Sequence, residues 1–444
     1  MTECSTSVML SPLGKKPVVV TNDGGNVTSD AGVLLLRDVD REIGLIRRMV
    51  QCLGDSRDQS KVQHTLEALI GQRVFQMAAG YEDCNDADSL RSDPAFKLAV
   101  GRALSDAALA SQSTLTRFEN RITRQDCRRL SDALLECFLA RHREAPPARI
   151  ILDFDPTDDK THGQQQFSFY QHHYGSHCYL PLLVFAQCEE GGEQELLAAV
   201  LRAGNVHGGK RALAVLTRLV TRLRAAFPRC RIEFRADSGF ALPELYDGCE
   251  ALKVRYTISL PKNDALLRLA GPWLDAAEEL FRETGRTVQV FGEFLYRAHS
   301  WTRARRVIVK AEWMEKGPNP RFLVTSSGTL SAASRYRFYC QRGDVENRIK
   351  ELKEGLHADR LSCHRFVANQ FRLLLHGAAY VVLQTLRRRL AGTPLAKAQV
   401  ETLRLRLLKV GARIKESARR IVIHLPSAYP WFGVWSLLAP ASPG

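Results

Sequence analysis

Acidic side chains stand near the ends of two predicted strands. Asp153 and Asp155 share one face of the predicted strand 149–155, because side chains alternate along a strand. Asp237 ends a second predicted strand, 231–237, just before a Ser-Gly pair. Carboxylates at strand ends of an α/β sheet lie where such folds place their active sites. The alternative is that each aspartate only turns or caps the chain, which is common for this residue type.

A predicted helix over 331–356 gathers functional side chains on one face. Four of them are Tyr339, Arg342, Glu346 and Lys353. Their offsets of 0, 3, 7 and 14 place them within about 60° around a straight helix, and Lys350 joins the stripe. A carboxylate between cations suits a surface that holds a divalent ion and DNA phosphates. The alternative is a solvated face with ion pairs such as Glu346–Lys350.

Composition and charge limit the class of protein. The chain has 444 residues, of which 45% are hydrophobic and 25% charged, so it is a folded globular chain of two or three domains. The net charge is +15, and residues 361–444 alone hold 13 basic and 2 acidic side chains. This excess indicates a polyanionic partner, with nucleic acid ahead of a membrane surface.

The same sequence argues against a membrane or secreted protein. No run approaches eighteen apolar residues, and the first sixteen residues lack the order of a secretory signal. The eleven cysteines are scattered and never spaced as CxxC, so disulfides and zinc ribbons are not expected. We therefore expect a protein of the reducing cytoplasm that is not bound to a membrane.

The order of predicted elements indicates an α/β core between helical ends. After a proline-containing linker at 145–147, the pattern β-β-β-α-β-α-β favours a mixed sheet with helices on its faces. A polar helical stretch and three strand-like runs then interrupt this core. The expected division is a helical N-terminal domain at 1–145, the first part of the core at 146–262, a β-rich insertion at 263–328, the second part of the core at 329–390, and a basic helical tail at 391–444.

Two further segments are candidates for DNA contact. Residues 108–121 have the outline of a helix-turn-helix, in which Ser113, Thr114 and Arg117 would face a groove. The alternative there is an ordinary helix that Ser113 caps. Near the end of the predicted helix 366–390 lie three consecutive arginines, which are Arg387, Arg388 and Arg389. They would contact phosphates, or else only solubilise a helix end.

These motifs together resemble a branch of bacterial insertion-sequence transposases. The spacing Tyr339-x2-Arg342-x3-Glu346-x6-Lys353 reproduces the YREK signature of that branch. The stretches DPT at Asp155 and ADSGF at Asp237 resemble its two aspartate motifs. Three further stretches, THGQQ from Thr161, YLPLLVF from Tyr179 and NQFRLLLHGAAY from Asn369, look like insertion-sequence group 1380. The resemblance runs from about Val18 to Arg389.

The resemblance implies an RNase H-like core with a DDE triad of metal-binding carboxylates. By motif the triad is Asp155, Asp237 and Glu346, although Asp153 competes for the first position. In this branch a β-rich insertion separates the second and third carboxylates. The remaining signature residues, Tyr339, Arg342 and Lys353, would contact phosphates at the transposon end. Relatives also use an aromatic residue of the insertion to hold a flipped base, and Trp301 is the candidate here; the alternative is that Trp301 is a core residue.

The implied activity is DNA transposition. Two Mg²⁺ ions, or Mn²⁺, are expected in the active site, because oxygen-only ligands select these ions. The protein would bind the terminal inverted repeats, cleave the ends, and join the 3′-hydroxyls to target DNA. A homodimer in the synaptic complex and a bacterial, nucleoid-associated location are also implied. The alternatives are a metal-dependent nuclease of the same fold and a catalytically silent DNA-binding protein derived from a transposase.

Overall fold

The computed structural model describes residues 7–189 and 192–438, which form two compact units. One unit is the continuous stretch 122–377, and the other joins 1–121 to 378–444. This division differs from the expected one. The proline-containing linker at 145–147 lies inside the first of these units, and the C-terminal tail folds with the N-terminal segment instead of standing alone.

One mixed sheet forms the centre of unit 122–377, and it contains nine strands among the described residues. Its order is β12-β13-β15-β11-β10-β4-β8-β9, with β14 beside β13. The five core strands are β4 (Arg149–Pro156), β8 (Leu182–Gln187), β9 (Gln194–Val200), β10 (Arg231–Ala236) and β11 (Arg255–Leu260). β4, β10 and β11 are parallel to one another, whereas β8 and β9 are antiparallel to their neighbours. A mixed α/β fold is therefore confirmed, and its sheet fits an RNase H-like core.

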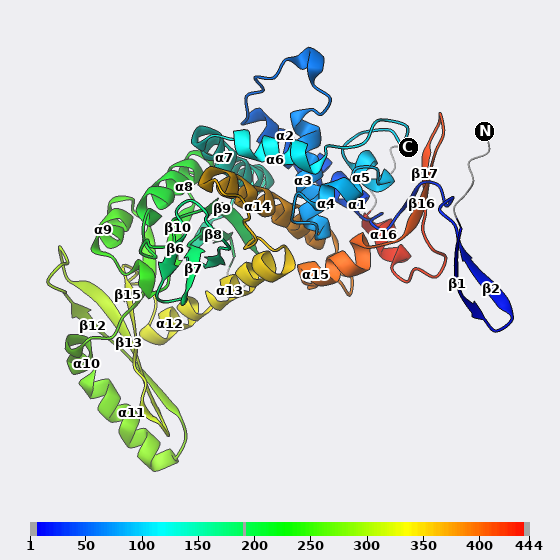
Figure 1. The fold of residues 1–444 in the computed structure, drawn as a ribbon. Coiled ribbons are helices and arrows are strands. Elements are labelled where there is room, and N and C mark those ends of the chain that lie inside the picture. The colour runs from blue at the N-terminus through cyan, green and yellow to red at the C-terminus, as the bar shows by residue number, and fades with distance from the viewer. Residues whose placement is uncertain (1–6, 190–191, 439–444) are drawn as a thin grey trace. The chain divides into compact units, whose positions relative to one another are not determined.

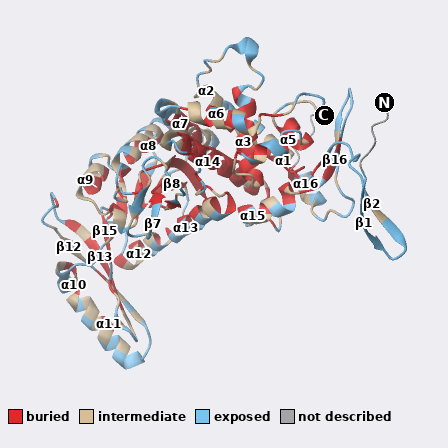
Figure 2. Cartoon of the chain, viewed as in Figure 1, coloured by how far each residue is buried: buried red, intermediate tan, exposed pale blue. Residues whose placement is uncertain are grey.

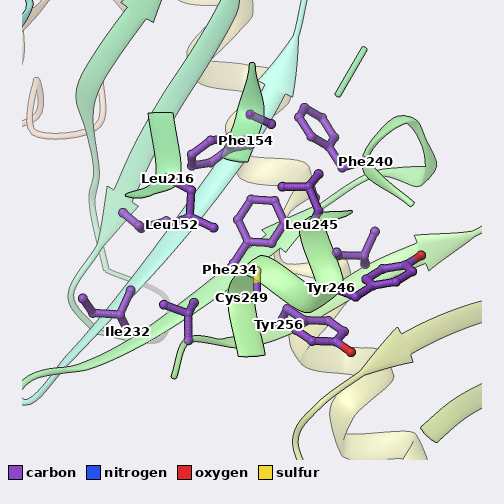
Figure 3. Close-up of a cluster of buried hydrophobic side chains, with 14 of the residues drawn as sticks. Leu152, Phe154, Leu216, Ile232, Phe234, Phe240, Leu245, Tyr246, Cys249 and Tyr256 are labelled. Carbon is purple, nitrogen blue, oxygen red and sulfur yellow. The ribbon is translucent and has the colours of Figure 1, made fainter. Parts of the chain in front are cut away.

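Helices α8 (Ala212–Ala226) and α9 (Pro243–Ala251) cover an apolar face of this sheet. Figure 3 shows Phe154 and Phe234 of the two central strands beside Leu216 and Leu245 of these helices. All four side chains are fully buried. Burying one such side chain contributes about 1.5–3 kcal/mol, so this layer is a main source of the stability of the core. A further helix of the unit is α7 (Arg124–Arg141).

The insertion continues the core sheet. Its elements are α10 (Asp264–Leu269), α11 (Gly271–Thr284), β12 (Val288–Tyr296), β13 (Arg305–Met314), β14 (Gly317–Pro318) and β15 (Arg321–Thr325). β15 pairs antiparallel with β11, which joins the inserted strands to the core. A Cβ at Gly292 would lie 2.1 Å from the Trp273 ring, so glycine is needed where α11 packs on β12. The predicted helical stretch and three strand runs are confirmed here.

The helix predicted over 331–356 is not continuous. It consists of α12 (Ala332–Cys340), a turn at Gln341 and Arg342, α13 (Gly343–Lys350), and a π-helical turn, Glu351–Gly355. A π-helical turn has more residues per turn than an α-helix, so it rotates the following side chains away from the straight-helix positions. The prediction of one continuous stripe was therefore wrong.

Helix α14 (Phe366–Arg389) is the longest of the described helices. By length and composition alone it could cross a bilayer, but 83% of its most apolar window is buried inside the protein. Figure 2 shows it mostly in the colour of buried residues. This pattern is typical of the core helix of a folded protein.

Both ends of the chain build the second unit. Its helices are α1 (Val33–Ile43), α2 (Leu45–Gln51), α3 (Leu66–Ala79), α4 (Asp86–Leu90), α5 (Pro94–Ala99), α6 (Gln112–Arg121), α15 (Val400–Leu403) and α16 (Phe432–Leu438). Its strands are β1 (Val8–Leu13), β2 (Lys16–Val20), β3 (Val27–Thr28), β16 (Ala412–Glu416) and β17 (Ile421–His424). β3 pairs with β16 from the far end of the chain. A purely helical N-terminal domain and a helical tail were thus wrong expectations, because strands from both segments share one sheet.

Residues 31–32 and 407–410, from the N-terminal and C-terminal segments, lie in direct contact in this unit. The backbone amide of Gly32 donates to the carbonyl of Leu408 at 3.2 Å, and that of Ala31 to Val410 at 3.0 Å. A Cβ on Gly32 would lie 1.9 Å from the carbonyl oxygen of Leu407, so no larger residue fits there without a shift of the backbone. The C-terminal segment is therefore an integral layer of this unit.

Candidate active site

Three of the predicted carboxylates converge on one guanidinium group. The Arg342 Nη2 atom lies 2.8 Å from Asp155 Oδ1 and 3.7 Å from Asp237 Oδ2. Its Nη1 atom lies 3.6 Å from Glu346 Oε1. Residues 82 and 109 positions apart in the sequence are thus gathered around a single cation.

The strand register brings the two aspartates together. β4 and β10 are parallel neighbours with Phe154 opposite Ala236, so the next residue of each strand lies at the same edge. Asp237 Oδ1 accepts a 2.8 Å hydrogen bond from the amide of Gly239 and so caps the short 3-10 turn, Ser238–Phe240. The cap predicted as an alternative is therefore present at Asp237, but it leaves Oδ2 directed to Arg342.

The short helix α13 presents the third carboxylate. Glu346 lies in its first turn, and Arg342 stands at its N-cap position. The side chains of Asp155, Asp237 and Glu346 are 10%, 35% and 70% exposed, respectively. Asp155 therefore lies deepest in the cluster and Glu346 at its rim.

Burial changes the acidity of Asp155. The pKa of this carboxyl is raised to about 7. Loss of hydration is the largest cause, the Arg342 charge opposes it, and the charges of Asp237 and Glu346 add to it. Each added negative charge makes ionisation of Asp155 harder, whereas a cation in the cluster favours it. The cluster thus has three carboxylates and a single guanidinium, so when all three carboxylates are ionised their negative charge exceeds the positive charge beside them.

Asp153 has a different role from its neighbour on the strand. It is fully buried, and Arg235 binds both of its oxygens, with Nε to Oδ1 at 2.6 Å and Nη2 to Oδ2 at 2.7 Å. Gln194 donates to Oδ2 at 3.4 Å. Because these contacts use both carboxylate oxygens inside the protein, the geometry favours Asp155 as the first member of the carboxylate cluster.

The same arginine connects the sheet to the helices that carry the signature residues. Arg235 Nη1 donates a 2.6 Å hydrogen bond to the backbone carbonyl of Phe338 in α12. A second buried pair supports this link, with Arg335 of α12 3.1 Å from Glu233 of β10. The Phe338 ring also lies under the Arg235 guanidinium, 4.9 Å away. Arg235 was not among the predicted site residues, although an arginine between apolar residues in a predicted buried strand is a signal for a buried ion pair.

The signature cations are placed unequally. Arg342 is buried among the carboxylates. Lys353 contacts Asp158, with its Nζ 2.7 Å from both the backbone carbonyl oxygen and Oδ1. Lys350 pairs with Glu354 at 3.6 Å, four residues further along the chain. The alternative pair, Glu346–Lys350, is therefore not the one that Lys350 makes. Lys353 lies within the π-helical turn, Glu351–Gly355, where the spacing of a straight α-helix no longer holds.

Tyr339 and Trp301 are both largely withdrawn from the surface. Burial raises the pKa of the Tyr339 hydroxyl, which lies near Ser259 and Arg342. Trp301 is 5% exposed and packs edge-on against Tyr246 at 5.2 Å, in the hydrophobic core. The core alternative for Trp301 is therefore the one that the structure supports, and its ring offers no open face to a base.

The predicted helix-turn-helix differs from the structure. α6 is formed, but twelve residues separate it from the end of α5. The motif requires a turn of only three or four residues between its two helices. Glu119 of α6 is buried and pairs with Arg73 at 2.9 Å, so this side of the helix packs inside its unit. Ser113 and Arg117 are exposed on α6, and Ser113 lies inside the helix instead of at its cap. Thr114 is half-buried, near Ser111.

The three consecutive arginines at the end of α14 face protein partners. Arg387 is buried and donates to the carbonyl of Ala398 at 3.2 Å. Arg388 donates to Thr385 at 3.1 Å, and Arg389 pairs with Glu42. The prediction of a DNA contact is corrected for Arg387, which is buried and holds the following loop. For Arg388 and Arg389 it stays a prediction.

The carboxylate cluster has the donors that a hard divalent ion prefers. Among residues 7–189 and 192–438, no group of three or more His, Cys, Asp or Glu side chains has the spacing of a preformed metal site. The three carboxylates instead surround the Arg342 guanidinium, which supplies the positive charge at that point. An oxygen-only set that already converges on a cation fits Mg²⁺ or Mn²⁺ once the guanidinium moves aside.

Comparison with known proteins is consistent with this geometry. A family model described as transposase DDE domain group 1 matches residues 10–439, which is nearly the whole chain. The search of curated proteins gave no match.

Proposed function

The chain belongs to the transposase DDE domain group 1 family, and on that premise we propose that it is the transposase of a bacterial insertion sequence, of the YREK-signature branch and resembling group 1380. It is an enzyme of a family that acts on DNA. The proposal is that it binds terminal inverted repeats, cleaves the element ends, and joins their 3′-hydroxyls to target DNA. The convergence of Asp155, Asp237 and Glu346 on Arg342 carries this proposal.

The three carboxylates would hold the divalent ions. Held by these side chains, a pair of Mg²⁺ ions would supply an activated water and would neutralise the charge that builds on the scissile phosphate. Asp155 would anchor the buried side, and Glu346 the exposed side, where DNA enters. Arg342 would exchange its carboxylate partners for a DNA phosphate, and Tyr339 would line the same surface. Lys353 would hold Asp158 as well as contact phosphate.

The synaptic complex would contain two copies of the chain, each bound to one element end. The cytoplasm, with the nucleoid as the source of target DNA, is the proposed location. Exposed cations on α6, such as Arg117, are proposed contacts to the element end. Arg388 and Arg389 are proposed to contact DNA phosphates in addition to the protein groups that they bind.

A cleavage and joining assay separates this proposal from its nearest alternative. The probe is a labelled duplex with the inverted repeats that flank the gene, incubated with Mg²⁺ and a supercoiled target plasmid. A transposase is expected to nick at the repeat boundary and to transfer the labelled strand to the plasmid. Cleavage without any labelled plasmid would favour a nuclease, and binding without cleavage would favour a silent DNA-binding derivative.

Metal affinity is expected to depend on pH. Asp155 has a pKa near 7, so below that pH a proton must leave before the carboxylate can bind an ion. We expect Mn²⁺ affinity to rise up to about tenfold per pH unit until about pH 7 and to level off above it. Titration of Mn²⁺ by electron paramagnetic resonance measures this without turnover. The Asp155→Asn variant should bind weakly and show a flat profile over the same range, and a wild-type profile that is already flat would contradict the assignment.

A further inference from the structure

Exposed aromatic side chains are concentrated in one short segment. Among the described residues, four Phe, Tyr or Trp side chains are exposed, and three of them are Phe167, Phe169 and Tyr170. They lie in residues 161–177, here called the aromatic finger, which contains β6 (Phe169–Gln171). The small sheet that carries the finger is completed by β5 (Asp159–Lys160) and β7 (Ser176–Tyr179). Exposed rings are costly in water, so such a concentration indicates a binding surface.

The finger is held in a defined conformation. Phe167 has φ of +63°, a left-handed value that is unusual for a bulky residue. Its ring packs edge-on against Phe366 at 5.4 Å, and its carbonyl accepts from the amide of Gly204 at 3.3 Å. A Cβ on Gly204 would lie 2.7 Å from the carbonyl oxygen of Phe169, so the chain passes too closely for a larger residue. Backbone strain that packing maintains is a feature of functional segments.

The finger lies beside the carboxylate cluster. It begins six residues after Asp155, the second-last residue of β4, with only β5 between them. Tyr174 of the finger is close enough to Asp155 and Asp237 for their charges to raise the pKa of its hydroxyl, after the larger effect of burial. Just before the finger, Asp158 pairs with Lys353 of the π-helical turn that follows α13, the helix that carries Glu346. A strand of DNA that reaches the carboxylates would therefore pass the finger.

Charge and ring chemistry together select the partner. Residues 160–177 include Lys160 and four histidines and contain no Asp or Glu. Tyr170 contacts His172 and His177 edge-on, at 5.2 and 5.5 Å, so imidazole rings, whose N–H groups can donate hydrogen bonds, flank its ring. Such a surface suits phosphates beside planar, uncharged bases. Base faces in the interior of a duplex are covered by their neighbours, so away from a blunt end exposed rings can stack only on unpaired bases.

We propose that the aromatic finger binds unpaired nucleotides next to the scissile phosphate, by stacking bases on Phe169 and Tyr170. This inference rests on the proposed function and adds a position at which the protein separates or holds single-stranded DNA. It also assigns to a core hairpin the base contact that the sequence had suggested for Trp301 of the insertion.

The test compares two probes that differ only in unpaired nucleotides. One is a blunt duplex with the element end, and the other is the same duplex with a short oligothymidylate extension that carries 2-aminopurine at its first unpaired position. Binding is measured without divalent metal, so that no cleavage intervenes. Stacking should change the 2-aminopurine fluorescence of the extended probe and make it bind more tightly than the blunt one.

The variants Phe169→Ala and Tyr170→Ala should weaken binding of the extended probe about tenfold each and leave the blunt probe unchanged. Tyr170→Trp should restore the tight binding and the fluorescence change, because any aromatic face can stack. Leu295→Ala is the matched control, since Leu295 is also an exposed apolar side chain of this unit, at 72% exposure. It should behave as the wild type with both probes.

Equal losses with both probes, or no loss with either, would overturn the proposal. The second result would be expected if the finger instead docked another protein. Failure of the inference is distinct from failure of the proposed function, because the cleavage and joining assay uses Mg²⁺ and a target plasmid. A protein that joins strands normally but ignores the extension remains a transposase without a base-stacking finger.

Discussion

The Asp237→Asn variant is expected to lose DNA cleavage, by at least about a thousandfold, while it keeps its affinity for element ends. The amide has the shape of the carboxylate and can still accept the hydrogen bond from Gly239 that caps the following turn. It lacks the negative charge that would hold a divalent ion opposite Asp155 and Glu346. Cleavage of an end-labelled repeat duplex with Mg²⁺, and binding of the same duplex with Ca²⁺, measure the two properties separately.

Asp58→Asn is the matched control for this variant. Asp58 also caps a 3-10 turn, Gln59–Lys61, through its side chain, but it is exposed and belongs to the other unit. Its replacement should change neither cleavage nor binding. If Asp237→Asn cut the duplex at a rate near that of the wild type, the carboxylate cluster would not be the catalytic centre.

The Asp153→Ala variant is expected to lower the free energy of unfolding by about 3–5 kcal/mol. Without the aspartate, the Arg235 guanidinium remains buried with no negative partner, and a buried charge without a partner is strongly unfavourable. The hydrogen bond from Arg235 to the carbonyl of Phe338 alone cannot compensate for that loss. Urea denaturation of unit 122–377 within the full chain, followed by tryptophan fluorescence, measures the change.

The double variant Asp153→Leu with Arg235→Met tests the cause. Replacing both members of a buried pair with apolar side chains of similar size is often neutral for stability. We therefore expect the double variant to recover most of the stability lost by Asp153→Ala. A double variant as unstable as the single one would show that packing, and not the unpaired charge, sets the cost.

Local pattern predicted much of unit 122–377. The alternation of apolar residues in RIEFRAD and the acidic residues after the two strands located β4, β10 and the strand-end aspartates. The strand runs of the insertion were also visible, because each is rich in β-branched and aromatic residues over a short stretch. Motif resemblance selected Glu346 and Arg342, which no local rule would have joined to Asp155.

The pairing of strands far apart in the sequence could not be predicted from local pattern. A two-residue strand such as Val27–Thr28 has no periodicity, and its partner Ala412–Glu416 lies at the other end of the chain. The turn at Gln341 and Arg342 and the π-helical turn after Lys350 depend on packing against the sheet, so a straight-helix projection misplaced Lys353. Charge counting likewise treated Arg387 as available to DNA. Its burial depends on how the following loop, which includes Ala398, packs against the end of α14. Each error concerns tertiary context, which a single sequence window does not contain.

The pairing of β3 with β16 has a consequence for protein synthesis. Unit 122–377 is one continuous stretch, so all of its strands are available before Ala412 has been translated. The other unit cannot close its sheet until Ala412 has been translated, some 385 residues after Val27, which takes about 20–80 s at typical bacterial rates. During that time the apolar faces of α1 and α3 lack their C-terminal cover. Nascent chains in this interval are therefore natural clients for chaperones, and ribosome stalling near the end of the gene would release a protein with a finished carboxylate cluster but an open terminal unit.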